Sequence, residues 1–342
     1  MATPKSNTRI LFTRACNILP LIKQLDAAGV PTGRLLDRAH IQIDSLKAPE
    51  SLIPLDFAHK FVELAVRNEG IQDLALQVAR DTSSFELGSF GRQLQDALTV
   101  QEYLHAGIQL VGASTSGTRF WLTMEGGEIR FHQFTPGKDG LGRCQADLYN
   151  LGITIEMLRG FSNGQWSPRE VSLLQGDEKS IVDWAWFGSA RILTGQTHTS
   201  FTIPLSLLQK PIIRQYDPHA GALTSSSSKQ MPEDFIDSIK QFIATLLADG
   251  YPDIDMVAET MSMSRRTLQR RLAASGFSYS DLVSQVRLEN AARFLADTGM
   301  PVTQIAASLG YTDSSNFTRA FRTRTGVSPS DYRDNVSEAK QT

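Results

Sequence analysis

The sequence predicts two domains, an α+β domain on the N-terminal side and an all-α domain on the C-terminal side. Three observations support this: the length of 342 residues, a segment rich in Pro, Gly and Ser, and helix patterns alone beyond it. The segment, YDPHAGALTSSSSKQMPE, contains four consecutive serines and favours a linker over a packed element. We therefore predict one domain over 1–215, a linker over 216–233 and a second domain over 234–335.

The N-terminal domain mixes helix and strand patterns. Residues 17–110 are mainly helical in pattern, and apolar residues recur at near-helical spacing in 55–68. Residues 119–134 alternate apolar and polar residues around a Glu-Gly-Gly turn, which predicts a β-hairpin. A helix and two short strands are predicted next, over 145–161, 169–174 and 197–203. Together, the predicted helices and strands indicate an α+β fold.

The C-terminal domain shows no strand pattern. It contains six or seven short helical segments separated by Gly, Ser or Pro. The first, 234–247, is amphipathic, and Pro252-Asp253 leads into the second, IDMVAETM. We therefore expect this domain to be entirely helical.

Composition narrows the class of protein. Apolar residues make up 41% and charged residues 20%, which is typical of a globular protein. We find no apolar run long enough for a transmembrane helix and no secretion-type apolar core near the N-terminus. Cys16 and Cys144 have no metal-type spacing. We expect reduced thiols in a cytoplasmic protein that does not enter a membrane.

Positive charge is concentrated in one segment. The net charge of −2 argues against a uniformly basic nucleic-acid binder. Residues 260–333, however, hold ten arginines against five acidic residues, so this segment carries +5 and the rest of the chain −7. Four of the arginines lie within SRRTLQRRLAASG, 264–276. Such local charge is typical of DNA-binding domains, although by itself it would equally fit a solvated helix face.

An internal repeat favours the DNA-binding interpretation. IDMVAETMSMSRRTLQRRLAASGFS (254–278) aligns with VTQIAASLGYTDSSNFTRAFRTRTGVS (302–328). Each copy has the pattern of a short helix, a tight turn, a second helix opened by a capping residue, and a glycine stop. This is the pattern of a helix-turn-helix. The segment between the copies predicts a long helix that ends at Gly299 and joins the two units.

One face of the second helix in the first copy suits a DNA groove. At 100° per residue, Arg266, Gln269 and Arg270 fall within an arc of about 100°. Leu268 and Leu272 lie on the opposite side and would anchor the helix. Arginine can hold guanine, and glutamine adenine, with two hydrogen bonds each. Two such units about 34 Å apart would enter successive major grooves.

The repeat and its tail resemble the AraC/XylS family of bacterial transcription regulators. The likeness is strongest in IAASLGYTDSSNFTRAFRTRTGVSPSDYR, 305–333, and extends over about 235 to 335. The resemblance implies base-facing positions at Arg266, Gln269, Arg270, Ser314, Ser315, Asn316 and Arg319. We also expect Arg265 and Arg322 to contact DNA. Ser314 and Ser315 have short side chains, which favours contact with phosphates over base reading.

The N-terminal domain resembles the arabinose-binding-type effector domain of a subgroup of this family. The likeness lies in SLIPLDFAHKFVELA, DALTVQEYL, WFGSARILTG and FTIPLSLLQKP. It implies a small-molecule effector, homodimerisation, or both. The expected function is sequence-specific transcription regulation, more specifically activation through promoter DNA and RNA polymerase. An N-terminal domain that only dimerises or docks a protein partner is the alternative.

The predicted hairpin offers candidate effector-binding residues. A tryptophan can stack on a ligand, and an arginine can hold a carboxylate or phosphate. The candidates are Arg119, Trp121, Arg130 and His132. The competing interpretation, favoured for each residue singly, is an exposed sheet face with core side chains from Phe120, Leu122, Phe131 and Phe134.

No enzyme signature stands out. The six histidines lack metal-type spacing, GLGRCQ (140–145) lacks the third glycine of a dinucleotide loop, and GASTSG (112–117) departs from G-x-S-x-G. We therefore expect no catalytic residue, no metal and no cofactor. A DNA-tethered enzyme is the remote alternative.

Overall fold

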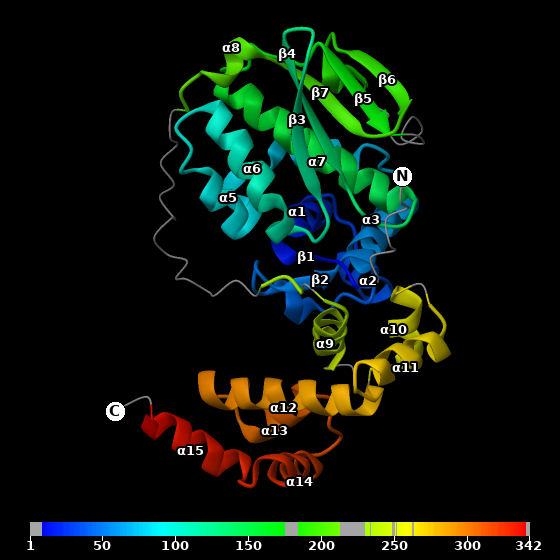
Figure 1. Ribbon diagram of the computed structural model, residues 1–342, viewed down its shortest axis with the longest axis vertical. Coiled ribbons are helices and arrows are strands. Elements are labelled where there is room, and N and C mark those ends of the chain that lie inside the picture. The colour runs from blue at the N-terminus through cyan, green and yellow to red at the C-terminus, as the bar shows by residue number, and fades with distance from the viewer. Residues whose placement is uncertain are drawn as a thin grey trace. The chain divides into compact units, whose positions relative to one another are not determined.

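The computed structural model describes residues 9–174, 184–212 and 230–339, apart from 233, 248, 249, 251 and 262. The described residues form two compact units, an N-terminal unit within Leu11–Met231 and a C-terminal unit within Met1–Ile10 and Pro232–Thr342. Figure 1 shows both units. Most of the predicted linker over 216–233 lies outside the described residues, so its boundaries stay predictions. No described helix is long and apolar enough to cross a membrane.

The N-terminal unit is α+β, which confirms the predicted fold class. Its α-helices are α1 Leu19–Ala27, α2 Thr32–Arg38, α3 Leu55–Glu69, α4 Leu74–Asp81, α5 Gly88–Leu94, α6 Val100–Ser114, α7 Leu141–Phe161 and α8 Leu205–Leu208. Its 3-10 helices are η1 Ala15–Asn17, η2 Ile43–Leu46, η3 Ser84–Leu87 and η5 Trp184–Phe187. Its strands are β1 Phe12–Arg14, β2 Leu52–Pro54, β3 Arg119–Glu125, β4 Glu128–Phe134, β5 Glu170–Leu174, β6 Arg191–Gln196 and β7 Thr199–Pro204.

The main sheet has the strand order β3-β4-β7-β5-β6. Strands β5 and β6 run parallel, and the other neighbours run antiparallel. The predicted hairpin is confirmed as β3–β4, and the turn glycines Gly126 and Gly127 have φ values of 60° and 84°. Positive φ at both central positions is what a two-residue hairpin turn of this twist requires. Strands β1, β2 and β6 were not among the predicted strands.

Helix α7 forms the centre of the N-terminal unit. It packs against α3 and α4 and against strands β4 and β7, as Figure 1 shows for its course beneath the sheet. Two glycines allow the close approach: a Cβ at Gly142 would lie 2.1 Å from the His59 carbonyl oxygen, and one at Gly152 would lie 2.7 Å from the Ala79 Cβ. A helix that is buried on several sides lacks a clear amphipathic period. For this reason the predicted start of α7, at residue 145, lies four residues after the observed start at Leu141.

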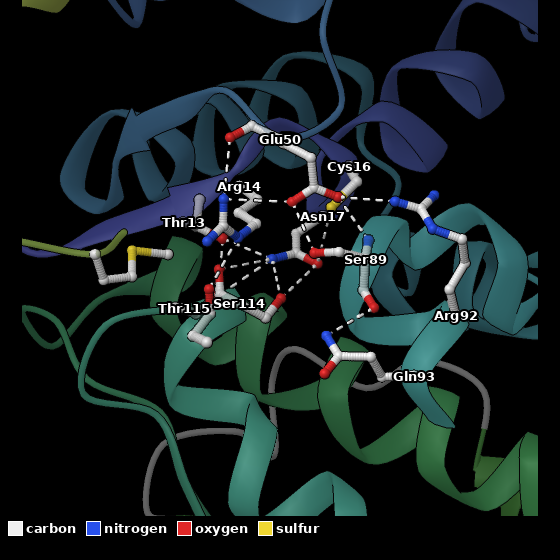
Figure 2. A network of polar contacts seen from close by, with 12 residues as sticks. Thr13, Arg14, Cys16, Asn17, Glu50, Ser89, Arg92, Gln93, Ser114 and Thr115 are labelled. Carbon is white, nitrogen blue, oxygen red and sulfur yellow. Dashed lines mark hydrogen bonds and ion pairs between the residues drawn. The ribbon is translucent and has the colours of Figure 1, made fainter. Parts of the chain in front are cut away.

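A buried ion pair fastens the first strand to the helices around it. The Arg14 guanidinium lies 3.3 Å from the Glu50 carboxylate, and both side chains are almost fully buried. Arg14 also donates to the Ala113 carbonyl, 2.9 Å away, at the end of α6. Glu50 in turn accepts hydrogen bonds from the backbone and hydroxyl of Ser89 in α5. Figure 2 shows this network, which joins β1, the loop before β2, α5 and α6.

The buried thiol beside this pair is held in its neutral form. Burial and the neighbouring charge of Glu50 raise the pKa of Cys16 to about 12. Both Cys16 and Cys144 are free of disulfide bonds. A thiol with so high a pKa is a poor nucleophile, so Cys16 acts here as a packing group.

The described part of the C-terminal unit is entirely helical, which confirms the predicted class. Its helices are α9 Phe235–Leu246, α10 Ile254–Thr260, α11 Arg265–Ala274, α12 Tyr279–Asp297, α13 Val302–Ser308, α14 Ser314–Thr325 and α15 Pro329–Ala339. The long helix α12 packs against α9, α13 and α15. It joins the α10–α11 pair to the α13–α14 pair, as the repeat predicted (Figure 1).

Gly310 lies in the turn between α13 and α14 and allows this turn to pack against the residues that follow α9. Its φ is +72°, and a Cβ there would lie 2.4 Å from the Leu247 carbonyl oxygen and 2.5 Å from that of Gly250. Both the backbone conformation and the space therefore require glycine.

Replacing Glu50 with alanine should strongly destabilise the N-terminal unit. The Arg14 charge would remain buried without its partner, which costs about 3–5 kcal/mol. All four tryptophans precede residue 187, so their fluorescence during urea denaturation reports on this unit. Asp44→Ala removes the exposed Asp44–Lys47 pair and serves as the control, with almost no expected change. A Glu50→Ala loss no larger than the control's would contradict this account.

Gly310→Ala should lower the stability of the C-terminal unit by about 2–3 kcal/mol, because it combines a strained φ with overpacking. The measurement is urea denaturation followed by far-ultraviolet circular dichroism. Gly299→Ala is the matched control, because no heavy atom lies within 4 Å of its added Cβ and its φ is not positive. Equal stability of the two variants would show that the contact with α9 is unimportant.

Candidate nucleic-acid interface

The first helix-turn-helix consists of α10 and α11. The Asp253 side chain caps α10 by accepting from the Asp255 backbone, and Ser264 caps α11 by accepting from the Thr267 backbone. Leu268 and Leu272 are completely buried. The predicted capped helix with an apolar back is thereby confirmed in this unit.

The second helix-turn-helix consists of α13 and α14. Asp313 caps α14 by accepting from the Asn316 backbone at 2.8 Å. Phe317 and Phe321 are buried and stack edgewise against further rings, Phe317 on Tyr311. Gly326, with φ of +81°, ends the helix.

The two units share the same turn. Ala258 and Ala306, which aligned in the sequence repeat, are both buried. The Met263 backbone donates to the Ala258 carbonyl at 2.9 Å, and the Tyr311 backbone donates to the Ala306 carbonyl at 3.0 Å. The sequence repeat therefore reflects a repeated local structure, despite the extra residue in the second turn.

The faces opposite the buried stripes are exposed and polar. On α11, Arg266, Gln269 and Arg270 are all exposed. On α14, the exposed residues are Ser315, Asn316, Arg319 and Arg322. Ser314 differs, because it is half-buried at the edge of the apolar stripe. Each reading helix thus presents a hydrogen-bonding surface away from its core, and the DNA contacts themselves stay predictions.

Two of the predicted DNA-contacting residues also have partners within the unit. Arg265 forms an ion pair with Asp255 at 3.0 Å, with both side chains about half exposed. The Asn316 amide donates to the Asp313 carboxylate at 2.5 Å. Arg266 and Arg270, by contrast, have no ion pair among the described residues. Arg271, off the arc, is likewise exposed and has no ion pair among the described residues, so on α11 only Arg265 has an ionic partner within the unit.

Several other arginines of this basic segment support the scaffold. Arg287 lies over the Tyr311 ring at 4.7 Å and donates to the Gly310 carbonyl. Arg333 donates to the Met300 carbonyl at 2.5 Å. These contacts tie α12 to the turn of the second helix-turn-helix and α15 to the segment just before α13.

The four candidate effector residues lie on the outer face of the main sheet. Trp121 stacks on His132 with ring centroids 5.1 Å apart and an interplanar angle of 4°. Arg119 lies over the Phe134 ring at 5.2 Å. Phe134 is therefore on this outer face, and the prediction that it belongs to the core is wrong. The strand alternation places Phe131 inside and Phe134, three residues on, outside.

Arg130 is already neutralised. Its guanidinium bonds the Glu125 carboxylate at 2.8 Å and the Glu170 carboxylate at 2.6 Å, and it reaches the hydroxyls of Ser172 and Ser200. Partial burial lowers the pKa of His132, which keeps that ring neutral at pH 7. The structure brings the four residues to one face, and their role in effector binding stays a prediction.

Two hollows inside the N-terminal unit were not predicted from any sequence pattern. The first, which we name the hairpin chamber, holds about 630 Å³ of space between α5, α6, α7 and the inner face of β3–β4, partly open to solvent. The second, the helix chamber, holds about 520 Å³ between α1, α3 and α7. They adjoin at Asn17, Thr115, Thr118, Tyr149 and Asn150. None of the four outer-face residues lines either chamber.

The described residues contain no group of three or more His, Cys, Asp or Glu side chains placed to hold a metal ion.

Two family models match the chain. The model described as "Arabinose-binding domain of AraC transcription regulator, N-term" matches residues 29–212. The model described as "Helix-turn-helix domain" matches residues 257–335. Together they cover most of the N-terminal unit and, apart from the start of α10, both helix-turn-helix pairs.

Curated relatives match over part of their length. The chain is 33% identical to the Ornithine utilization regulator of Pseudomonas aeruginosa over 131 residues, 38% of each chain. It is 34% identical to the HTH-type transcriptional regulator VirS of Mycobacterium tuberculosis over 143 residues, 41% of this chain and 42% of that one. The matches thus span less than half of these relatives. The crystal structure of the transcriptional regulator CdpR from P. aeruginosa aligns with 89% of this chain and 96% of its own, at 22% identity and a TM-score of 0.39.

Proposed function

The chain belongs to the AraC family of transcription regulators, and on this premise we propose that it activates transcription from specific promoters under the control of a small-molecule effector. It is a DNA-binding regulator rather than an enzyme, as are the proteins that it resembles. The proposal adds activation, effector control, homodimerisation and a cytoplasmic location.

The observation that carries the proposal is the exposed Arg/Gln face of α11. Leu268 and Leu272 fix the rotation of the helix, so Arg266, Gln269 and Arg270 point away from the core. Two of these are arginines without an ion pair among the described residues, and their geometry suits bidentate contact with guanine. We assign base reading in the first half-site to these three side chains.

The second half-site is assigned to α14. The α14 side chains assigned to this half-site are Ser314, Ser315, Asn316 and Arg319. Arg322 of α14 and Arg265 of α11 add further contacts with the DNA. The half-buried position and short side chain of Ser314 favour a phosphate contact. Asn316 must exchange its bond with Asp313 for one with DNA. The second half-site should therefore be read more loosely than the first.

Helix α12 sets the separation of the two reading helices. Its 19 residues extend about 28 Å at 1.5 Å per residue. This length suits two helices in successive major grooves on one side of the duplex, about 34 Å apart.

Effector control requires the N-terminal unit to bind its ligand unequally in two states. The ligand then shifts the balance between an arrangement that recruits RNA polymerase and one that does not. Activation is the outcome that the family resemblance implies.

Arg270→Ala should weaken binding of the cognate site by about 1–3 kcal/mol and relax the base preference at one position. Arg271→Ala is the matched control on the same helix. Arg271 is also exposed but lies off the base-facing arc. Its loss should therefore weaken binding to all DNA sequences evenly or not at all. The site is first selected from random-sequence DNA with the full chain, and affinities are then measured by fluorescence anisotropy at fixed salt. Equal, sequence-independent losses in both variants would contradict the assigned helix orientation.

A further inference from the structure

The described walls of both chambers carry no formal charge. No Asp, Glu, Lys or Arg lines either one. Burial lowers the pKa of His59, in the helix chamber, to about 4, so its ring is neutral at pH 7. Burial also raises the pKa of Tyr103 and of Tyr149, which keeps their hydroxyls protonated. An ion placed here would lose its hydration and gain no opposite charge, at a cost of several kcal/mol.

The wall of the hairpin chamber is mostly apolar. Aromatic and aliphatic side chains reach it from four directions: Phe90, Leu104, Val111, Phe120, Phe131 and Ile153. A sugar, with a hydroxyl on nearly every carbon, would leave the hydroxyls that face these apolar side chains without partners. Each unpaired buried hydroxyl costs about 1–3 kcal/mol. The wall therefore suits a mainly apolar molecule, although the matched family model is described as arabinose-binding.

Buried polar wall atoms without a hydrogen-bond partner among the described residues include the Thr118 hydroxyl and the His59 Nε2. The Thr118 hydroxyl, on a residue that is 3% exposed, lies where the two chambers adjoin. The His59 Nε2 lies in the helix chamber. Asn17 differs, because its amide already donates to Thr13 and Ser114, as Figure 2 shows. A ligand with one or two hydrogen-bonding groups would supply partners for the Thr118 hydroxyl and the His59 Nε2.

The wall at Thr118 belongs to a loop that holds both ends of the N-terminal unit. In this loop, 115–118, the Ser116 backbone donates to the Phe12 carbonyl at 2.8 Å, and its hydroxyl lies 3.4 Å from the Met231 sulfur. Phe12 and Met231 stand beside the two points where the chain leaves this unit. Thr13 and Thr115 add a hydroxyl contact of 2.8 Å. A ligand that moves this loop therefore acts on both points where the chain leaves this unit.

We propose that the joined chambers are the effector site, and that the effector is a small, uncharged, mainly apolar molecule with one or two hydrogen-bonding groups. This inference rests on the proposed effector control and names the site and ligand class for it. The outer sheet face is the competing site, where Trp121 stacks on His132.

Gly107 on α6 offers a direct way to fill the hairpin chamber. It is buried and lines this chamber, yet an added Cβ would meet no heavy atom within 4 Å. Gly107→Leu should therefore occupy the ligand space without a backbone clash. Gly112→Leu is the matched control: Gly112 lies on the same helix, is exposed, lines neither chamber and also has open space around its Cβ. Both changes raise helix propensity equally.

The probe is N-phenyl-1-naphthylamine, an uncharged apolar amine whose fluorescence increases in apolar surroundings. Its charged counterpart is 1-anilinonaphthalene-8-sulfonate, which has a similar shape with an added sulfonate. The full chain, without DNA, is titrated with each probe. We expect saturable binding of the uncharged probe and binding of the sulfonate at least about tenfold weaker. Gly107→Leu should lower the affinity for the uncharged probe at least about tenfold. Gly112→Leu and Trp121→Ala should change this affinity less than about twofold.

Thr118→Val provides a second test that does not depend on filling the chamber. Valine keeps the shape of threonine and removes the unpaired hydroxyl, so the chain should fold as before and bind the uncharged probe at least about threefold more weakly. Thermal melting checks folding of every variant.

The proposal is overturned if binding of the uncharged probe does not saturate, or if Gly107→Leu and Thr118→Val both bind this probe like the unmodified chain. It is also overturned if the sulfonate probe binds as tightly as the uncharged one, or if arabinose displaces the uncharged probe. Weakening by Trp121→Ala alone would assign the site to the outer sheet face instead. Failure of the proposed function would be recognised separately, because selection of DNA by the full chain requires no probe.

Discussion

The burial of two side chains one helical turn apart is the constraint on which the DNA-binding surface depends. Leu268 and Leu272 on α11, and Phe317 and Phe321 on α14, fix the rotation of each helix about its axis. Once that rotation is fixed, the opposite face must carry the residues that meet a partner. Arg266 and Arg270 are exposed for this reason, and the capping residues Ser264 and Asp313 fix where each helix begins.

The N-terminal unit contains polar groups that have partners within the unit and buried polar groups that have none among the described residues. On the outer sheet face Arg130 has two carboxylate partners, and at the centre of Figure 2 the buried Arg14 and Glu50 neutralise each other. In the chamber walls, Thr118 and His59 each have a buried polar atom without a hydrogen-bond partner among the described residues. A polar group that is already satisfied gains little from a ligand, whereas a buried unpaired one gains a hydrogen bond. This contrast separates a structural surface from a binding site.

Sequence reasoning succeeded where the signal was local. The helical period and caps of 264–276 and the Gly126-Gly127 turn depend on neighbours within a few residues, and they predicted both helix-turn-helix units and the hairpin. It failed where distant segments meet. The three-residue strands β1 and β2 exist only because they pair with each other, and the chambers are lined by residues from Thr13 to Thr154. The Arg265–Asp255 pair depends on the angle between α10 and α11, which no pattern contains.

We propose that the two reading helices joined by α12 enter successive major grooves. Hydroxyl-radical and methylation footprinting of the full chain on its selected site measures this most directly. The account predicts two protected segments on one side of the duplex, about one helical turn apart, with guanine N7 protected in the half-site that α11 reads. A single protected segment, or protection that does not depend on sequence, would contradict it.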